Sequence, residues 1–244
     1  MDRAVHRAFR ILETVTRAKE PLRLSTIASS LELQKSTVHR ILQTLVAMGY
    51  VVQEPNGGRY RPTLRTWEMG SNVLHDHPVK RAAAPFLAEL HRMTQETVSV
   101  MVLEGDDVIY LDKLIAPRPA RFTTRAGSRV PAPLTAGGQA MLALEPDARA
   151  IVERVARRVQ AERAFDAETV LAALETIRAR GYAVSRNNPD VVSVGGAILG
   201  RDGRAAGALS VSAPAERIDG TRLEATVEAV RVTCTRMAEF LGRL

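Results

Sequence analysis

The sequence contains a single cysteine, Cys234, which excludes a disulfide framework and a zinc cluster held by thiolates. It also lacks an apolar run that could span a membrane, because the longest candidates, 191–199 and 205–213, are short and interrupted by glycine or serine. The N-terminus carries charge into an amphipathic segment and has no signal-peptide core. We therefore expect a cytoplasmic protein with no membrane partner. Aromatic residues make up only 4% of the chain, which argues against stacking platforms for single-stranded nucleic acid.

The residues that are present suit a folded, basic protein. The chain has 244 residues, 45% of them hydrophobic and 25% charged, which is enough for two domains with real cores. Its formal net charge of +7 favours polyanionic partners without specifying their kind.

Hydrophobic periodicity predicts three short helices at the N-terminus. The first covers residues 4–18. Its apolar stripe consists of Val5, Ala8, Phe9, Leu12 and Val15. The second begins at Ser25, a residue typical of helix N-caps. After a connection at 32–34 the third runs to about Met48, and Gly49 suits the position that follows a helix end.

After the third helix the hydrophobic period changes from 3.6 to 2. Residues 50–53 and 59–61 read as two short strands joined by a Pro-Asn-Gly-Gly turn at 55–58. Three helices followed by a hairpin form the outline of a winged helix-turn-helix. A further helix at 64–77 ends near a His-Pro pair and reads as a connector. Its apolar residues Leu64, Trp67, Met69 and Val73 exceed what a short connector needs, so it is also a candidate dimer seam.

The remainder of the chain mixes strands and helices. Predicted helices cover 79–95, 136–145, 147–163, 167–180 and 221–243, predicted strands cover 97–104, 107–115, 182–186, 191–201 and 205–213, and 116–134 reads as a loop rich in Pro, Gly and Arg. The predicted fold class is α+β, with a winged helix-turn-helix domain at 1–63, a connector helix at 64–77 and a sensor-type α/β domain at 78–244.

The third helix carries the features of a helix that reads the major groove. With its apolar stripe turned inward, its outer side presents hydroxyls, which suit phosphates, and Lys, Arg and Gln, which reach base edges. Residues 21–65 contain six Lys or Arg against two acids, so the charge is also local. The predicted DNA contacts are Ser25, Lys35, Ser36, Thr37, His39, Arg40, Gln43, Thr44, Arg59 and Arg61. A merely solvated helix face, or a module for protein contacts, is the alternative.

Five segments, in order along the chain, carry a more specific resemblance. Residues 21–62, containing PLRLSTIA, KSTVHRIL and GYVV, resemble the DNA-binding domain of IclR-family transcriptional regulators. LEGDDVIYLD at 103–112, GSRVP at 127–131, TAGGQA at 135–140 and GALSVS at 207–212 resemble later segments of the same family. A helix-turn-helix alone is shared by many families, whereas this ordered set is much more specific.

The resemblance implies a GAF-like C-terminal domain that binds a small effector, often an organic or aromatic acid, and regulates an operator by repression or activation. It also implies homodimers, and sometimes tetramers formed as dimers of dimers. Matched position by position, the implied effector contacts are Val130, Ala136, Gly137, Ser185, Val191, Ser193, Ser210 and Ser212.

Thr135 adds a physical argument for the same site. It precedes a predicted helix that opens Ala136-Gly137-Gly138, where approachable N–H groups at a helix N-terminus would suit a carboxylate. The alternative is an ordinary N-cap with glycines for close packing. Three departures from the family pattern lie near this expected site, at Gln139, at 187–191 and at 196–197.

Two other functions compete with the regulator hypothesis. A DNA-binding bifunctional enzyme would need a nucleotide-phosphate loop within 78–244 or a catalytic motif, and the sequence shows neither. The segment 75–77, His-Asp-His, could ligate a metal, but it lies at the end of the connector without a clear third ligand, and a site needs three or four convergent ligands. Neither a metal nor a cofactor is therefore expected. An effector-independent DNA-binding protein would have a cavity filled by side chains such as Met101, Phe122 and Met141. The small residues at 136–138 and 195–196 argue for space instead.

Overall fold

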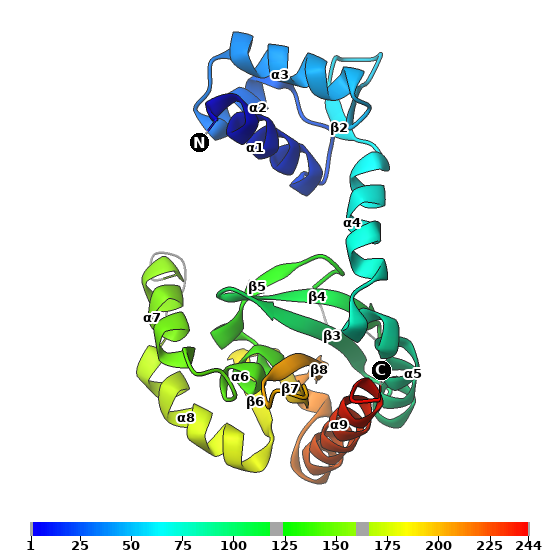
Figure 1. Cartoon of the computed structure of the whole chain (residues 1–244), viewed down its shortest axis with the longest axis vertical. Helices are drawn as coiled ribbons and strands as arrows, with labels where there is room; N and C mark the ends of the chain where they lie inside the picture. Colours follow the sequence, from blue (N-terminus) through cyan, green and yellow to red (C-terminus); the bar gives the residue numbers. More distant parts are fainter. Residues whose placement is uncertain (1, 118–123, 160–165, 244) are drawn as a thin grey trace. The chain divides into compact units, whose positions relative to one another are not determined.

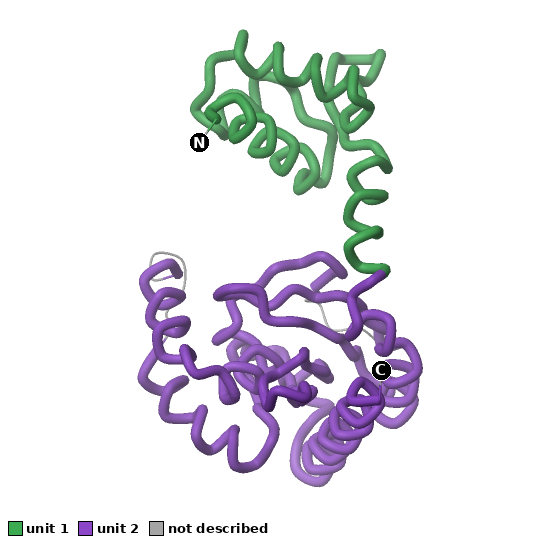
Figure 2. The backbone as a smooth tube through the Cα atoms, in the orientation of Figure 1, with its two compact units in different colours: residues 1–75 green, residues 76–244 purple. Residues whose placement is uncertain are grey.

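The computed structural model describes residues 2–117, 124–159 and 166–243. Two compact units divide the chain, Met1–His75 and Asp76–Leu244 (Figure 2). Part of the predicted loop at 116–134, the end of the predicted helix at 147–163, and Phe122 lie outside the described residues.

The first unit is the predicted winged helix-turn-helix followed by a helix (Figure 1). Its elements are α1 (Arg3–Arg17), α2 (Leu24–Leu31), α3 (Lys35–Ala47), β1 (Val51–Gln53), β2 (Tyr60–Pro62) and α4 (Arg65–His75). Ile11, Ile27, Leu42 and Tyr60 are fully buried in its small core. Gly49 follows the end of α3 with a φ of 76°, as expected of a glycine after a helix C-terminus.

Two local predictions for this unit are wrong. Ser25 is not an N-cap, because α2 begins at Leu24 with Arg23 in the cap position. The cause is tertiary: Leu22 pairs with Tyr60 through two backbone hydrogen bonds, which hold the chain extended up to Arg23. On α1 the buried face contains Ile11, whereas two residues of the predicted stripe, Val5 and Phe9, are exposed.

The second unit is built on a six-stranded antiparallel sheet with strand order β5-β4-β3-β8-β7-β6. Its strands are β3 (Thr97–Glu104), β4 (Asp107–Leu114), β5 (Arg129–Pro131), β6 (Tyr182–Asn188), β7 (Val191–Leu199) and β8 (Ala205–Pro214). Its helices are α5 (Pro78–Thr94), α6 (Ala136–Leu142), α7 (Ala148–Val159), α8 (Ala167–Arg180) and α9 (Gly220–Leu241), with short 3₁₀ turns η1 (Ala132–Leu134) and η2 (Ala215–Arg217). The segment predicted as a loop therefore contains β5 and η1. The pairing of β5 with β4 is a tertiary contact that the local sequence pattern does not predict.

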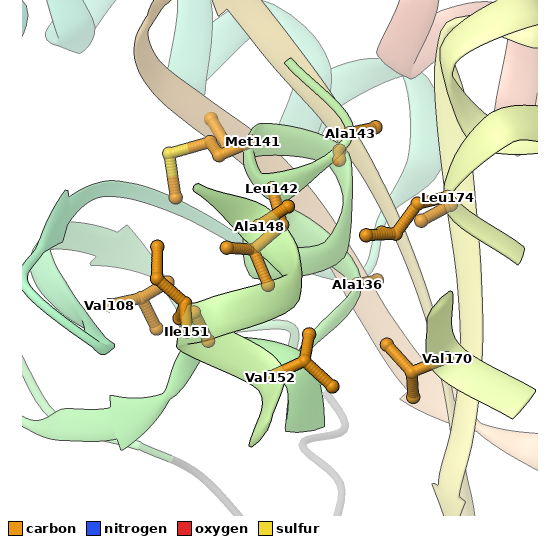
Figure 3. Close-up of a cluster of buried hydrophobic side chains, with 14 of the residues drawn as sticks. Val108, Ala136, Met141, Leu142, Ala143, Ala148, Ile151, Val152, Val170 and Leu174 are labelled. Carbon is orange, nitrogen blue, oxygen red and sulfur yellow. The ribbon is translucent and has the colours of Figure 1, made fainter. Parts of the chain in front are cut away.

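The helices cover the sheet from two sides (Figure 1). Helices α5 and α9 pack on one face, and α6 packs on the other, where α7 and α8 contribute to a buried apolar cluster (Figure 3). Strand β7 lies between α6 and α9. A methyl group at position 195 would lie 2.3 Å from the Gly137 nitrogen, and one at position 196 would lie 2.9 Å from Cys234 Sγ. The expectation that small residues at 195–196 leave open space is therefore wrong, because these glycines permit close packing on both faces.

Candidate functional site

The turn between α2 and α3 sets the orientation of the exposed face of α3. Glu32 adopts a left-handed conformation, with φ 54° and ψ 40°, and the Leu33 N–H donates to the Ala28 carbonyl over 3.0 Å. Val38, Ile41, Leu42 and Leu45 of α3 are then buried against the core of the first unit. The opposite face of α3 is left to solvent.

Nine of the ten predicted DNA contacts are exposed, and Thr37 is half-buried. Within the described residues, Lys35, Arg40 and Arg59 have no carboxylate within ion-pair distance, so their charges are available to a ligand. Arg61 differs from them because its Nε lies 3.6 Å from Glu54 Oε1. The Thr44 hydroxyl donates to the Arg40 carbonyl over 3.1 Å. The third helix and the hairpin thus present a polar, cationic surface within one unit.

The second unit contains a cavity of about 170 Å³ between its sheet and the start of α6. All nine predicted effector contacts line this cavity, although they come from widely separated parts of the sequence. They are Val130, Thr135, Ala136, Gly137, Ser185, Val191, Ser193, Ser210 and Ser212. The structure therefore brings the whole predicted set to one place.

Two rows of residues across the sheet give the cavity its polar lining. In one row Ser99 of β3 lies opposite Ser210 of β8, and in the other Thr97 lies opposite Ser212. Ser193 of β7 extends the second row, and its hydroxyl lies 2.8 Å from the Ser212 hydroxyl. This geometry follows from the period of two along each strand, which places alternate side chains on one face.

The α6 side of the cavity combines capping with close packing. The Gly138 N–H donates to Thr135 Oγ1 over 2.9 Å, so Thr135 is the N-cap that the sequence predicts. A methyl group at Gly137 would lie 2.6 Å from Met101 Sδ, and one at Gly138 would lie 2.1 Å from the Ala132 carbonyl oxygen. Packing therefore requires both glycines, while Ala136 and Gly137 also line the cavity.

Several lining residues were missed by the sequence analysis. They are Thr97, Ser99, Tyr110, Lys113, Thr124, Leu134, Asn187 and Asn188. Thr97 and Ser99 were accessible to sequence reasoning, since they follow the same period of two as the predicted serines. Burial raises the pKa of the Tyr110 hydroxyl and lowers the pKa of the Lys113 ammonium.

Of the three departures from the family pattern, only the segment at 187–191 lines the cavity. Gln139 is buried and its Nε2 donates to the Pro133 carbonyl over 2.8 Å, so it serves the turn before α6. Gly196 packs against α9. Asn187 Nδ2 donates to the Leu134 carbonyl over 3.1 Å, which joins β6 to the η1 turn at the cavity.

Other candidate chemistry finds no assembled site in the described part of the chain. Among residues 2–117, 124–159 and 166–243, no group of three or more His, Cys, Asp or Glu is placed to hold a metal ion. None of the helices within these ranges is long and apolar enough to cross a membrane. Met101 and Met141 are fully buried in the apolar cluster of Figure 3 and do not line the cavity. Burial raises the pKa of the Cys234 thiol to about 12, as suits a packed core residue.

Comparison with known proteins decides the family. The model for the bacterial transcriptional regulator IclR C-terminal domain matches residues 71–238, and the model for the IclR helix-turn-helix domain matches residues 4–55. The chain belongs to the IclR family of bacterial transcriptional regulators. Both the predicted resemblance and the predicted fold class are thereby confirmed.

Relatives of this IclR-family chain are similar over their full length. SauR of Cupriavidus necator is 32% identical over 241 residues, covering 97% of this chain and 96% of that protein. The HTH-type transcriptional regulator KdgR of Escherichia coli is 28% identical over 244 residues, with 98% and 92% covered. The crystal structure of an IclR homolog from Microbacterium hydrocarbonoxydans, complexed with 4-hydroxybenzoate, has a TM-score of 0.82 at 23% identity, with 99% and 100% covered, which is a likeness of fold.

Proposed function

We propose that this IclR-family regulator binds operator DNA through α3 and the hairpin, and that a small carboxylic acid in the cavity of the second unit modulates that binding. The observation that carries the effector part is the convergence of all nine predicted contacts on one cavity. The domain limits of this proposal are 1–63 for DNA binding, 64–77 for the connector and 78–244 for effector binding and assembly.

The exposed face of α3 supports the DNA part. Residues near the start of a recognition helix contact base edges, so Lys35, Ser36 and His39 are placed to read bases, and Arg40 and Gln43 extend the same surface. Thr37, Thr44, Ser25 and the hairpin arginines Arg59 and Arg61 suit phosphates. Arg61 would exchange its Glu54 partner for a phosphate.

The size and lining of the cavity support the effector part. An engineered cavity of about 150 Å³ holds a benzene molecule, so a space of about 170 Å³ suits a ligand of similar bulk. Most of its lining residues carry a hydroxyl or amide group, which can bind the oxygens of a small acid, and the rest of the lining is apolar. The 4-hydroxybenzoate complex of the Microbacterium hydrocarbonoxydans homolog is consistent with such a ligand.

The exposed apolar residues of α4, and Leu64 just before it, support a homodimer. Leu64, Trp67 and Val73 are 75%, 67% and 74% exposed in the single chain, and Met69 is also exposed. No residue of α4 is buried. A second copy of the chain would cover these side chains and place two recognition helices on successive half-sites, and further contacts between second units would give a dimer of dimers.

A thermal-shift screen followed by DNA titration tests this proposal. Purified protein is melted with small aliphatic and aromatic acids, and a true ligand raises the melting temperature in proportion to the logarithm of its concentration. Each hit is then added to a titration of the operator. We expect the same acid to change operator affinity, and Ser210→Leu to abolish the shift while the variant still folds and binds DNA. Normal DNA binding with no effect of any acid would favour an effector-independent regulator.

A further inference from the structure

Lys113 provides the charge in the described lining of the cavity. Among the described residues that line the cavity, Lys113 alone has a charged side chain. Its ammonium donates to the Thr124 carbonyl, a neutral acceptor, which leaves two of its three donors for other partners. No Asp or Glu in the described ranges forms an ion pair with it. The cavity therefore holds a half-buried positive charge for which the described part of the chain provides no counter-ion.

The sheet keeps the neighbouring carboxylate away from this charge. Asp112 lies opposite Val100 and pairs with Lys80 of α5, on the face of the sheet away from α6. Lys113 lies opposite Ser99, whose side chain lines the cavity. Because Asp112 already has a cation, it is not the counter-ion of Lys113. Desolvation without a counter-ion is also the reason for the lowered pKa of Lys113.

We propose that Lys113 is the counter-ion of the effector carboxylate and makes the cavity selective for anionic over neutral ligands of the same shape. This inference rests on the proposed effector role of the cavity and adds its charge selectivity. The N–H groups at the start of α6 and the serine hydroxyls are neutral, and they can donate to an amide oxygen as well as to a carboxylate oxygen. Only the ammonium adds a formal positive charge, so its hydrogen bond to a carboxylate joins two ionised groups, whereas its hydrogen bond to an amide joins an ionised and a neutral group.

Matched acids and amides separate charge from shape. The probes are benzoate, 4-hydroxybenzoate and lactate, each with its primary amide, titrated calorimetrically into the full-length wild type and into Lys113→Met, Lys113→Arg and Lys80→Met. A charge-assisted hydrogen bond contributes about 1.5 kcal/mol or more, so we expect at least one acid to bind wild type about tenfold or more tightly than its amide. Lys113→Met should lower that ratio by about tenfold, and Lys113→Arg should keep it. Lys80→Met, which removes a lysine from the opposite face of the sheet, should leave the ratio unchanged.

The outcomes distinguish this inference from the proposed function. If amides bind as tightly as acids and alter operator affinity, the proposed effector role of the cavity would be supported. The role of Lys113 as a counter-ion would be overturned. An acid preference that Lys113→Met leaves unchanged would lead to the same two conclusions. If none of the six probes binds wild type, both the acid effector and its counter-ion are overturned. Circular dichroism spectra and melting temperatures of the variants show whether a lost preference reflects lost folding.

Discussion

Protonation of Lys113 couples acid binding to pH. Burial already lowers the pKa of its ammonium below the ordinary 10.5, and a bound carboxylate would raise it again. Acid affinity is therefore full below the pKa of the free protein and falls as pH rises through it. Burial raises the pKa of Tyr110, the other titrating group in the described lining, above 10.0, so that hydroxyl stays neutral over most of this range. We predict that benzoate affinity is constant near neutral pH and declines as the pH approaches and passes through the lowered pKa of Lys113, below 10.5.

Arginine provides the control for this pH dependence. Lys113→Arg keeps its charge far above pH 10, so its benzoate affinity should stay level over the same range. Calorimetric titrations at intervals from pH 7 to about 10 make the comparison. A wild-type profile as level as that of the arginine variant would contradict the assigned role. Benzoate is the suitable probe because it has no second titrating group in this range.

The same residues show how far the cavity could be predicted. Ser210 and Ser212 were predicted from the family resemblance, and the period of two along a regular strand agrees with it by placing both on one face. Lys113 was missed because β4 is irregular: the register shifts between Val100 and Met101, so Tyr110 and Lys113 face the same side although they are three residues apart. A regular strand with Tyr110 facing the cavity would turn Asp112 inward instead. Because of the bulge, the cationic Lys113 faces the cavity in place of the anionic Asp112. No local sequence pattern predicts this bulge.

At the scale of elements, the packing of β7 against α6 determines the position of the α6 residues that line the cavity. Gly195 of β7 lies directly against the backbone of α6, where the cavity is lined by Ala136 and Gly137. A methyl group there meets backbone atoms of α6, which cannot rotate away. We predict that Gly195→Ala lowers the free energy of unfolding by about 1–3 kcal/mol, as overpacking commonly does, and weakens acid binding by displacing α6.

Denaturant unfolding and benzoate titration of Gly195→Ala test this expectation. Gly70→Ala is the matched control, because nothing lies within 4 Å of a methyl group at that helical position. It should be neutral or slightly stabilising, since alanine favours the helix by up to about 1 kcal/mol over glycine. Equal stability of Gly195→Ala and wild type would show that α6 moves freely over β7, against the close packing described above.

The fold was more predictable than its boundaries because most helices carry a strong period of their own. Amphipathic α3 and its following glycine were found from local pattern alone. By contrast, β5 has three residues and exists through its pairing with β4, and the start of α2 is set by the bridge between Leu22 and Tyr60. Both of these errors lie where a contact distant in sequence decides the local conformation.

For the molecule as a whole, the apolar residues of α4 raise the question of assembly. Leu64, which immediately precedes α4, and Trp67 are spaced i,i+3, and Met69 and Val73 are spaced i,i+4, so the four residues form two pairs on different sides of the helix. These large side chains are exposed in the single chain. Because they have no packing to lose there, substitution should cost a monomer little. We predict that Trp67→Glu and Val73→Glu shift the protein toward monomers while its melting temperature at high dilution stays close to that of wild type.

Sedimentation and operator titration measure the two consequences together. A dimer links two recognition helices, so loss of the dimer should weaken binding to a two-half-site operator by about 10²-fold or more and leave binding to one half-site unchanged. Asn72→Glu adds the same charge at an exposed polar position of α4 and should keep both assembly and affinity. Trp67→Glu and Val73→Glu proteins that remain dimeric would place the seam elsewhere in the chain, because a buried carboxylate without a partner is too costly to retain in an apolar interface.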